Sequence, residues 1–325
     1  MEEKSTVKST GRFKRVLSNN TSVLILLVIL IVFAFVAPAL FGKANISQII
    51  LESSIYGMLA VGLSLVMMAG SIDLSIGYLM ALSAVVSTSV YNATGNIPLA
   101  FLLGLICGAL LGLINGTLIT KIGINPLIAT IAMSYIYSGI VNYCTNGGSM
   151  RAAELTLNAF YKAKLFGLSF LNTTVIIFVI LLILIGLVLR RTNIGNNLYI
   201  TGGNAEAGTL AGINTNRMLL LAYIACGVCC AIAGLFLSAR FSGASYTLGS
   251  GKEVFAISAC VIGGIKMSGG KGTMTNVLIG ILIMRVITTA LNVLCVPSAW
   301  TDFVSGMLLL VIIVADRISK RKEEA

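Results

Sequence analysis

Apolar residues fill this chain in about ten long stretches, separated by short clusters of Gly, Asn, Pro and charged residues. A stretch of about 20 apolar residues is long enough to cross the hydrocarbon layer of a bilayer as a helix. The pattern therefore predicts an all-α membrane protein with about ten transmembrane helices. The expected spans lie near residues 22–41, 48–69, 74–91, 97–119, 126–144, 172–189, 218–239, 254–265, 274–294 and 301–316.

The eighth expected span is short, and it opens directly into the Gly-rich run 263–272. A full crossing and a half-helix that re-enters the bilayer both fit this pattern, because irregular backbone is tolerated at membrane depth where protein or water surrounds it. A weak internal similarity links the two halves of the chain, since the run 81–84 follows Gly77 as the similar run 256–259 follows Gly251. The two runs start on opposite membrane faces in the expected topology. Spans 2–5 and 7–10 are therefore a possible inverted repeat.

Composition narrows the class of protein further. Of the 325 residues, 57% are hydrophobic and 10% charged, whereas water-soluble domains carry about 25% charged residues, so a soluble globule is excluded. The net charge of +11 does not indicate nucleic-acid binding, because the basic residues lie at span ends. Most of them fall in segments that the positive-inside rule places in the cytoplasm, Lys121 among them. We expect a multi-pass membrane protein with both termini cytoplasmic.

A polar segment, residues 202–213, separates the sixth and seventh spans. Asn204 is a typical N-cap residue and Gly212 a typical helix stop, so the residues between them are predicted to form two turns of helix on the cytoplasmic face. Glu206 is the one charged side chain in this segment. A membrane protein with so little chain outside the bilayer must use such a loop to contact soluble molecules.

A carboxylate interrupts two apolar runs at Asp73, close to Ser75. An ionisable residue at membrane depth is costly and needs a partner, a capping role or water. Either Asp73 caps the third span by accepting N–H groups of its first turn, or it gates or lines a polar path. Glu253, Arg285 and Asp302 also lie near or within spans, and none of these four ionisable residues has an evident partner in the sequence.

The fourth span carries a stripe of glycines spaced four residues apart, at Gly104, Gly108, Gly112 and Gly116. Such a stripe lets a neighbouring helix approach backbone to backbone. We expect these residues to pack rather than to carry chemistry, and we expect the fourth span to be central in the bundle.

Neither a metal nor a cofactor is expected. The chain has no His, and its seven Cys residues, at positions 107, 144, 226, 229, 230, 260 and 295, lie within or beside apolar runs, which favours packing over a zinc site. Lys271 lies in a Gly-rich run, but a phosphate loop requires Gly where Ile265 stands and Ser or Thr where Gly272 stands. The sequence therefore predicts no nucleotide site and no catalytic residue.

Four motifs follow one another in a characteristic order. They are Ser71-Ile72-Asp73-Leu74-Ser75-Ile76-Gly77, then Gly202-Gly203-Asn204-Ala205-Glu206-Ala207 with Ala211-Gly212-Ile213-Asn214, then Glu253 with Val261-Ile262-Gly263-Gly264, and finally Ser268-Gly269-Gly270-Lys271-Gly272. Over about residues 20–320 the chain closely resembles the permease subunits of ribose- and galactose-type ABC importers. The family is similar in architecture to the cobalamin importer, which implies ten spans and a coupling loop between the sixth and seventh.

The resemblance implies a permease that moves a monosaccharide or similar small polar solute inward by alternating access. The implied partners are a cytoplasmic ATP-binding-cassette ATPase, an extracytoplasmic solute-binding protein, a second permease copy or paralogue, and the lipid bilayer. The parts of the chain would be a cytoplasmic segment 1–21, a permease domain 22–316 with a cytoplasmic coupling loop 190–217, and a basic cytoplasmic tail 317–325. Residues expected to contact the ATPase are Gly203, Asn204, Glu206, Ala207 and Gly212.

The sequence does not identify the transported solute. The residues expected to gate or line the path are Asp73, Ser75, Glu253, Thr288 and Thr289. Around Glu253, Thr288 and Thr289 the chain departs from the usual family pattern. A nucleoside, a branched amino acid or a signalling sugar is therefore an alternative to a monosaccharide. An ion-driven secondary transporter would need paired intramembrane charges as relays, and an intramembrane enzyme would need a nucleophile with a base.

Overall fold

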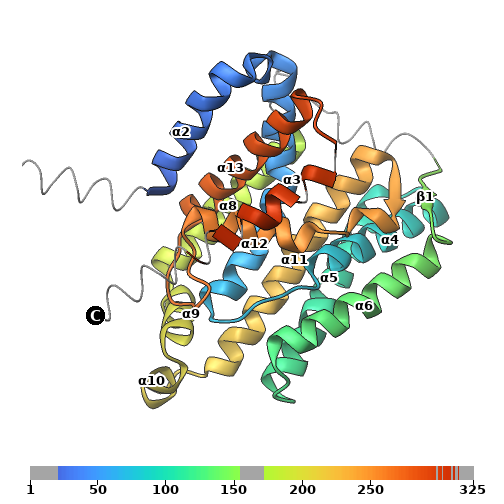
Figure 1. Ribbon diagram of the computed structural model, residues 1–325. Helices are drawn as coiled ribbons and strands as arrows, with labels where there is room; N and C mark the ends of the chain where they lie inside the picture. The colour runs from blue at the N-terminus through green and yellow to red at the C-terminus, as the bar shows by residue number, and fades with distance from the viewer. Residues whose placement is uncertain are drawn as a thin grey trace, which may run out of the picture.

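The computed structural model describes residues 21–153 and 172–297, and residues 299–314 apart from 302, 309, 312 and 313. The described part is a bundle of helices with one two-stranded antiparallel sheet, β1–β2 (Figure 1). In chain order the elements are α2 (Thr21–Val36), η1 (Pro38–Phe41), α3 (Lys43–Met68), α4 (Ile76–Thr94), α5 (Ile97–Thr120), α6 (Pro126–Cys144), β1 (Ser149–Arg151), α8 (Thr173–Arg191), α9 (Asn193–Gly203), α10 (Ala205–Leu210), α11 (Thr215–Phe241), β2 (Gly243–Ser245), η3 (Tyr246–Leu248), α12 (Lys252–Gly263) and α13 (Met274–Val293).

Seven of the described helices are long and apolar enough to cross a bilayer, namely α3, α4, α5, α6, α8, α11 and α13. Helix α2 is apolar but has 16 residues, and the expected span 301–316 falls partly outside the described residues. Helix α12 has 12 residues, a length of about 18 Å, against a hydrocarbon layer of about 30 Å. The length of α12 therefore favours the half-helix alternative for this segment. The expected cytoplasmic tail and most of the N-terminal segment lie outside the described residues.

Capping residues explain why the expected span boundaries lie close to the observed ones. The Asn96 side chain accepts the Leu99 N–H at 3.0 Å and starts α5, and Asn125 accepts the Leu127 N–H at 2.9 Å and starts α6. Both helices also carry Pro in the first turn, where a missing N–H costs nothing. The same kind of cap starts α8, α9, α11 and α13, at Asn172, Thr192, Asn214 and Thr273.

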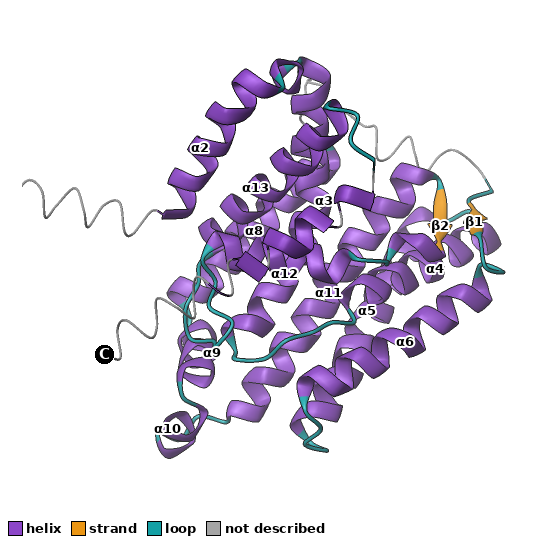
Figure 2. Cartoon of the chain, in the orientation of Figure 1, coloured by secondary structure: helices purple, strands orange, loops and turns teal. Residues whose placement is uncertain are grey.

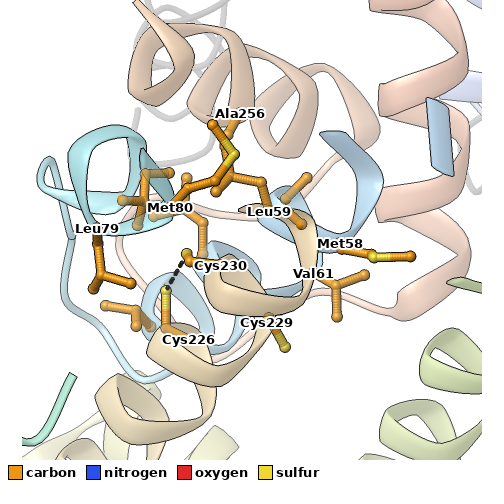
Figure 3. Close-up of a cluster of buried hydrophobic side chains, with 14 of the residues drawn as sticks. Met58, Leu59, Val61, Leu79, Met80, Cys226, Cys229, Cys230 and Ala256 are labelled. Atoms are coloured by element: carbon orange, nitrogen blue, oxygen red, sulfur yellow. Dashed lines mark hydrogen bonds between the residues drawn. The ribbon is translucent and has the colours of Figure 1, made fainter. Parts of the chain in front are cut away.

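The core is built around α3 and α11. Most of residues 53–68 in α3 and 226–239 in α11 are buried. Met58 and Leu59 of α3 pack there with Met80 of α4 and with Cys226 and Cys230 of α11 (Figure 3). The two sulfur atoms lie 3.9 Å apart, within reach of a weak hydrogen bond, and both thiols are free. These cysteines therefore serve as small apolar core residues.

The glycine stripe of α5 lies against α11. A Cβ atom added at Gly108 would collide with the Gly227 backbone of α11, and one added at Gly112 would collide with the backbone at Tyr223. This close approach is the packing that a small-residue stripe permits. The expectation that this span is central was wrong, because α5 buries this one face and leaves most of its other residues partly or fully exposed, whereas α3 and α11 are enclosed.

The helix packing repeats within the bundle. Helix α5 packs on α11 as α13 packs on α3, and α4 packs on α5 as α12 packs on α13. Both α4 and α12 begin after an irregular segment, and Figure 2 shows the loop before α4 running through the middle of the molecule. The short helix α10 lies at one end of the bundle and the β1–β2 sheet at the other (Figure 1).

Candidate functional site

The segment between α8 and α11 folds into two short helices, α9 and α10. As expected, Asn204 is the N-cap of α10, since its side-chain oxygen accepts the Ala207 N–H at 2.9 Å. Gly212 follows the helix with φ of +81°, a conformation that suits glycine at a helix end. Glu206 is exposed and the Leu210 side chain is 91% exposed. Both side chains therefore lie on the surface of this loop.

Behind this loop, backbone segments from the end of α3, the end of α9 and the loop before α13 meet closely. The Gly270 N–H donates to the Met68 carbonyl at 2.9 Å. A Cβ atom added at Gly202 would collide with that same carbonyl and come 2.8 Å from the Gly270 nitrogen. The Tyr199 hydroxyl of α9 donates to the Gly272 carbonyl at 2.8 Å. We call this contact the glycine junction, and it fixes the end of α9 against the end of α3.

Asp73 is completely buried in the loop before α4 and belongs to a polar network. Its Oδ1 atom accepts the Ser75 N–H at 2.8 Å and the Ser75 hydroxyl at 2.7 Å. Asn115 of α5 donates to Asp73 Oδ2 at 3.3 Å and to the Ser75 hydroxyl at 2.7 Å, and the Tyr137 hydroxyl of α6 donates to Asn115 at 2.9 Å. The capping hypothesis was wrong, because Asp73 binds the residue before α4 rather than N–H groups of its first turn. The carboxylate ties this loop to α5 and α6.

Asp73→Asn is expected to destabilise the protein less than Asp73→Leu. Asn keeps the oxygen that serves Ser75 and loses the bond with Asn115, a net cost of about 1 kcal/mol. Leu removes every acceptor and leaves buried donors unsatisfied, at about 1–3 kcal/mol for each group. Thermal unfolding of the two purified variants measures the difference. Equal loss of transport in both variants, with normal insertion and stability, would show that the carboxylate charge itself is needed.

Glu253 lies in the first turn of α12, where this helix meets the start of α4. A Cβ atom added at Gly77 of α4 would come 2.8 Å from Glu253 Oε2, which is buried and lacks a hydrogen-bond partner in the described part of the chain. Asp73 and Ser75 precede α4 directly, so three of the expected path residues gather where the two helices begin. Thr288 and Thr289 lie apart from them along α13, 5% and 4% exposed.

A partly buried ion cluster joins three helices, and its acidic member was not identified from the sequence. Glu52 of α3 pairs with Arg240 of α11 at 2.8 Å and with Arg285 of α13. The three side chains are 12%, 23% and 11% exposed. The Arg285 guanidinium also lies over the rings of Tyr56 and Phe255, 5.1 and 5.5 Å from their centroids. The expectation that Arg285 has no partner was therefore wrong. Its partner Glu52 lies 233 positions away in the chain, so sequence spacing gave no sign of the pair.

Together, seven membrane-length helices, the short helix α12 and an exposed helical loop define a polytopic helical membrane protein. The chain belongs to the family described as branched-chain amino acid transport system / permease component, whose model matches residues 45–313. This membership confirms the permease resemblance drawn from the four sequence motifs.

Named relatives cover nearly the whole chain. The ribose import permease protein RbsC of Escherichia coli (strain K12) is 33% identical over 92% of this chain and 94% of its own length. The L-arabinose ABC transporter permease protein AraH of Azospirillum brasilense is 30% identical over 98% of this chain and 93% of its own. The autoinducer 2 import system permease protein LsrC of Photorhabdus luminescens is 30% identical over 93% and 91%. No solved structure matches the chain.

The chain is therefore a membrane permease subunit of a transport system and not a catalytic enzyme. In such a system ATP hydrolysis belongs to a separate subunit, and solute is delivered by a binding protein.

Proposed function

We propose that this chain is the permease of an ATP-driven importer for a monosaccharide or similar small polar solute, and that α10 is its contact with the ATPase. The observation that carries the proposal is the exposed, capped helix α10, which directly follows the end of α9 that the glycine junction holds against the end of α3. Gly203, Asn204, Glu206, Ala207 and Gly212 shape or flank this helix, so movement of a docked ATPase would pass through the junction into the bundle.

The path is proposed to open and close near the starts of α4 and α12. Both helices begin at irregular segments, and discontinuous helices at membrane depth are typical of solute pathways. A cavity of about 290 Å³ lies beside the loop before α4 and is lined by Gly70, Ser71, Asn125, Pro126 and Met267, among others. ATP binding by the partner changes the populations of two conformations, which requires that the ATPase contact each of them with a different affinity.

The helix arrangement supports an inverted repeat of spans 2–5 and 7–10, as in a cobalamin-importer-like permease with ten spans. The paired packing of α5 on α11 and α13 on α3 is what a pseudo-two-fold relation requires. The half-helix α12 and the helix α4 would then be equivalent elements entering from opposite faces. A dimer of two permease chains, with the path between them, completes the proposed assembly.

We place both termini and α10 in the cytoplasm and the β1–β2 sheet outside, in the bacterial cytoplasmic (inner) membrane. Arg190 and Arg191 end α8, and Arg217 starts α11, on the side of α10, as the positive-inside rule requires. The expected organisation is a cytoplasmic segment 1–21, a permease domain 22–316 and a cytoplasmic tail 317–325.

A cysteine at Ser250, in a background without the seven native cysteines, is expected to react with an impermeant thiol reagent added outside intact cells. Ser250 is exposed and lies between the β1–β2 sheet and α12. A cysteine at Lys121, at the opposite end of the bundle, is the matched control and should react only after the membrane is opened. The reverse pattern would invert the proposed topology.

The relatives' names indicate which solutes to test first. They name ribose, L-arabinose and autoinducer 2, and a further relative is a D-allose transport system permease protein. Uptake of each labelled sugar, with a branched amino acid and a nucleoside as the alternatives, is measured in a strain that carries or lacks this chain. Uptake of at least one sugar that depends on the chain supports the proposal. Uptake confined to the amino acid or the nucleoside replaces the proposed solute class.

A further inference from the structure

Four hydroxyl side chains from separate parts of the chain gather at the starts of α4 and α12. They are Tyr78 of α4, Ser138 of α6, Tyr246 of η3, and Ser250 shortly before α12. The Tyr78 hydroxyl is within hydrogen-bonding reach of the other three, and we call the four the hydroxyl cluster. The Ser138 hydroxyl donates to the Tyr246 hydroxyl at 3.3 Å. The rings of Tyr78 and Tyr246 are 5.7 Å apart between centroids and tilted by 38°. The cluster therefore combines hydrogen-bonding groups with two aromatic surfaces.

Tyr78 of the hydroxyl cluster lies at membrane depth, and the cluster is open to its surroundings. Tyr78 is sixteen residues from Thr94, the last residue of α4, a distance of about 24 Å along the helix. Tyr78 and Tyr246 are partly exposed and Ser250 is exposed. Hydroxyl groups turned toward hydrocarbon lose their hydrogen bonds with water, which is costly. An open polar cluster at this depth is therefore best explained by a water-filled path.

The cluster presents neutral groups only. Glu253 is the nearest acidic residue along the chain, but its Oε2 atom is buried against Gly77. Each hydroxyl can both donate and accept a hydrogen bond, which matches a solute whose own groups are hydroxyls. The ring surfaces add apolar contact for the carbon skeleton of such a solute.

We propose that the hydroxyl cluster is a binding station for a neutral polyhydroxylated solute on its way through the permease. The inference rests on the proposed function and adds to it the residues that hold the solute inside the membrane. A site built to hydrogen-bond hydroxyl groups loses affinity when one side of the bond is deleted, because the remaining buried group is left unpaired.

The test uses the complete importer, with ATPase and binding protein, in proteoliposomes loaded with ATP. Uptake of labelled D-ribose, L-arabinose and D-allose is measured together with ATP hydrolysis. The double variant Tyr78→Phe/Tyr246→Phe, which keeps both rings, is expected to lower uptake per ATP by roughly tenfold. Ser138→Ala should lower it less. Tyr143→Phe, at an 84% exposed tyrosine of α6, is the matched control and should match the wild type.

The possible outcomes separate the two claims. If the wild type imports none of the three sugars, both the proposed function and the proposed binding station are contradicted. If the wild type imports a sugar and the double variant imports it equally well per ATP, only the station is overturned. If the double variant loses uptake and hydrolysis in parallel and no longer forms the permease dimer, the cluster is a packing contact between chains and the station is again overturned.

Discussion

Glu206→Arg is expected to reduce solute uptake per ATP hydrolysed by at least roughly tenfold, while the external binding protein still captures solute normally. Glu206 is exposed on α10, which we propose contacts the ATPase. An acidic side chain in such a contact pairs with a basic one, and charge reversal brings like charges together at a cost of several kcal/mol. A loss of about 1.4 kcal/mol already corresponds to a tenfold weaker association.

The measurement is simultaneous uptake and hydrolysis in proteoliposomes that contain the ATPase and the binding protein. Lys121→Glu is the matched control, because it reverses an exposed charge at the same end of the bundle, after α5 and outside α10. It should leave uptake per ATP unchanged. Normal coupling in the Glu206→Arg variant would refute the role proposed for α10.

Glu52→Gln is expected to lower the free energy of unfolding by about 3–5 kcal/mol, the usual cost of breaking a buried ion pair from one side. The substitution keeps the shape of the side chain but leaves Arg240 and Arg285 without their carboxylate. Because these residues come from α3, α11 and α13, the loss weakens the contact among three helices at once. Thermal unfolding in lipid nanodiscs measures the effect.

Two further variants test whether loss of the Glu52 charge causes the expected decrease in stability. Glu52→Gln/Arg285→Gln also removes one of the two arginines that pair with Glu52 and should recover part of the stability. Glu206→Gln removes an exposed carboxylate and should leave stability within about 0.5 kcal/mol of the wild type. If Glu52→Gln unfolds at the wild-type temperature, the cluster contributes nothing to stability.

The features that the sequence predicted are those set by local chemistry. Helix α10 was predicted because Asn204 caps it and Gly212 ends it, both within a few residues of one another. Span boundaries followed from apolar length and from caps such as Asn96 and Asn125. The permease class followed from four motifs in order, and family membership confirms it.

The features that escaped prediction depend on residues far apart in the chain. Glu52 gave no signal by itself, since its partners lie 188 and 233 positions away. The glycine stripe of α5 predicted a close helix contact but not that α5 keeps only this one face buried. Capping of the nearest helix was one of two alternatives for Asp73, but its first oxygen binds Ser75 and its second binds Asn115 of α5. In each case the partner is chosen by the three-dimensional packing.

The central claim is that this permease is driven by ATP through a partner ATPase and not by an ion gradient. The paired charges of Glu52, Arg240 and Arg285 make the ion-driven alternative worth a direct test. Uptake is measured in proteoliposomes with the ATPase and the binding protein, in the presence of ionophores that abolish all ion gradients. Uptake is expected to persist with Mg-ATP and to stop when ATP, the ATPase or the binding protein is omitted. Uptake that needs an ion gradient and proceeds without ATP would contradict it.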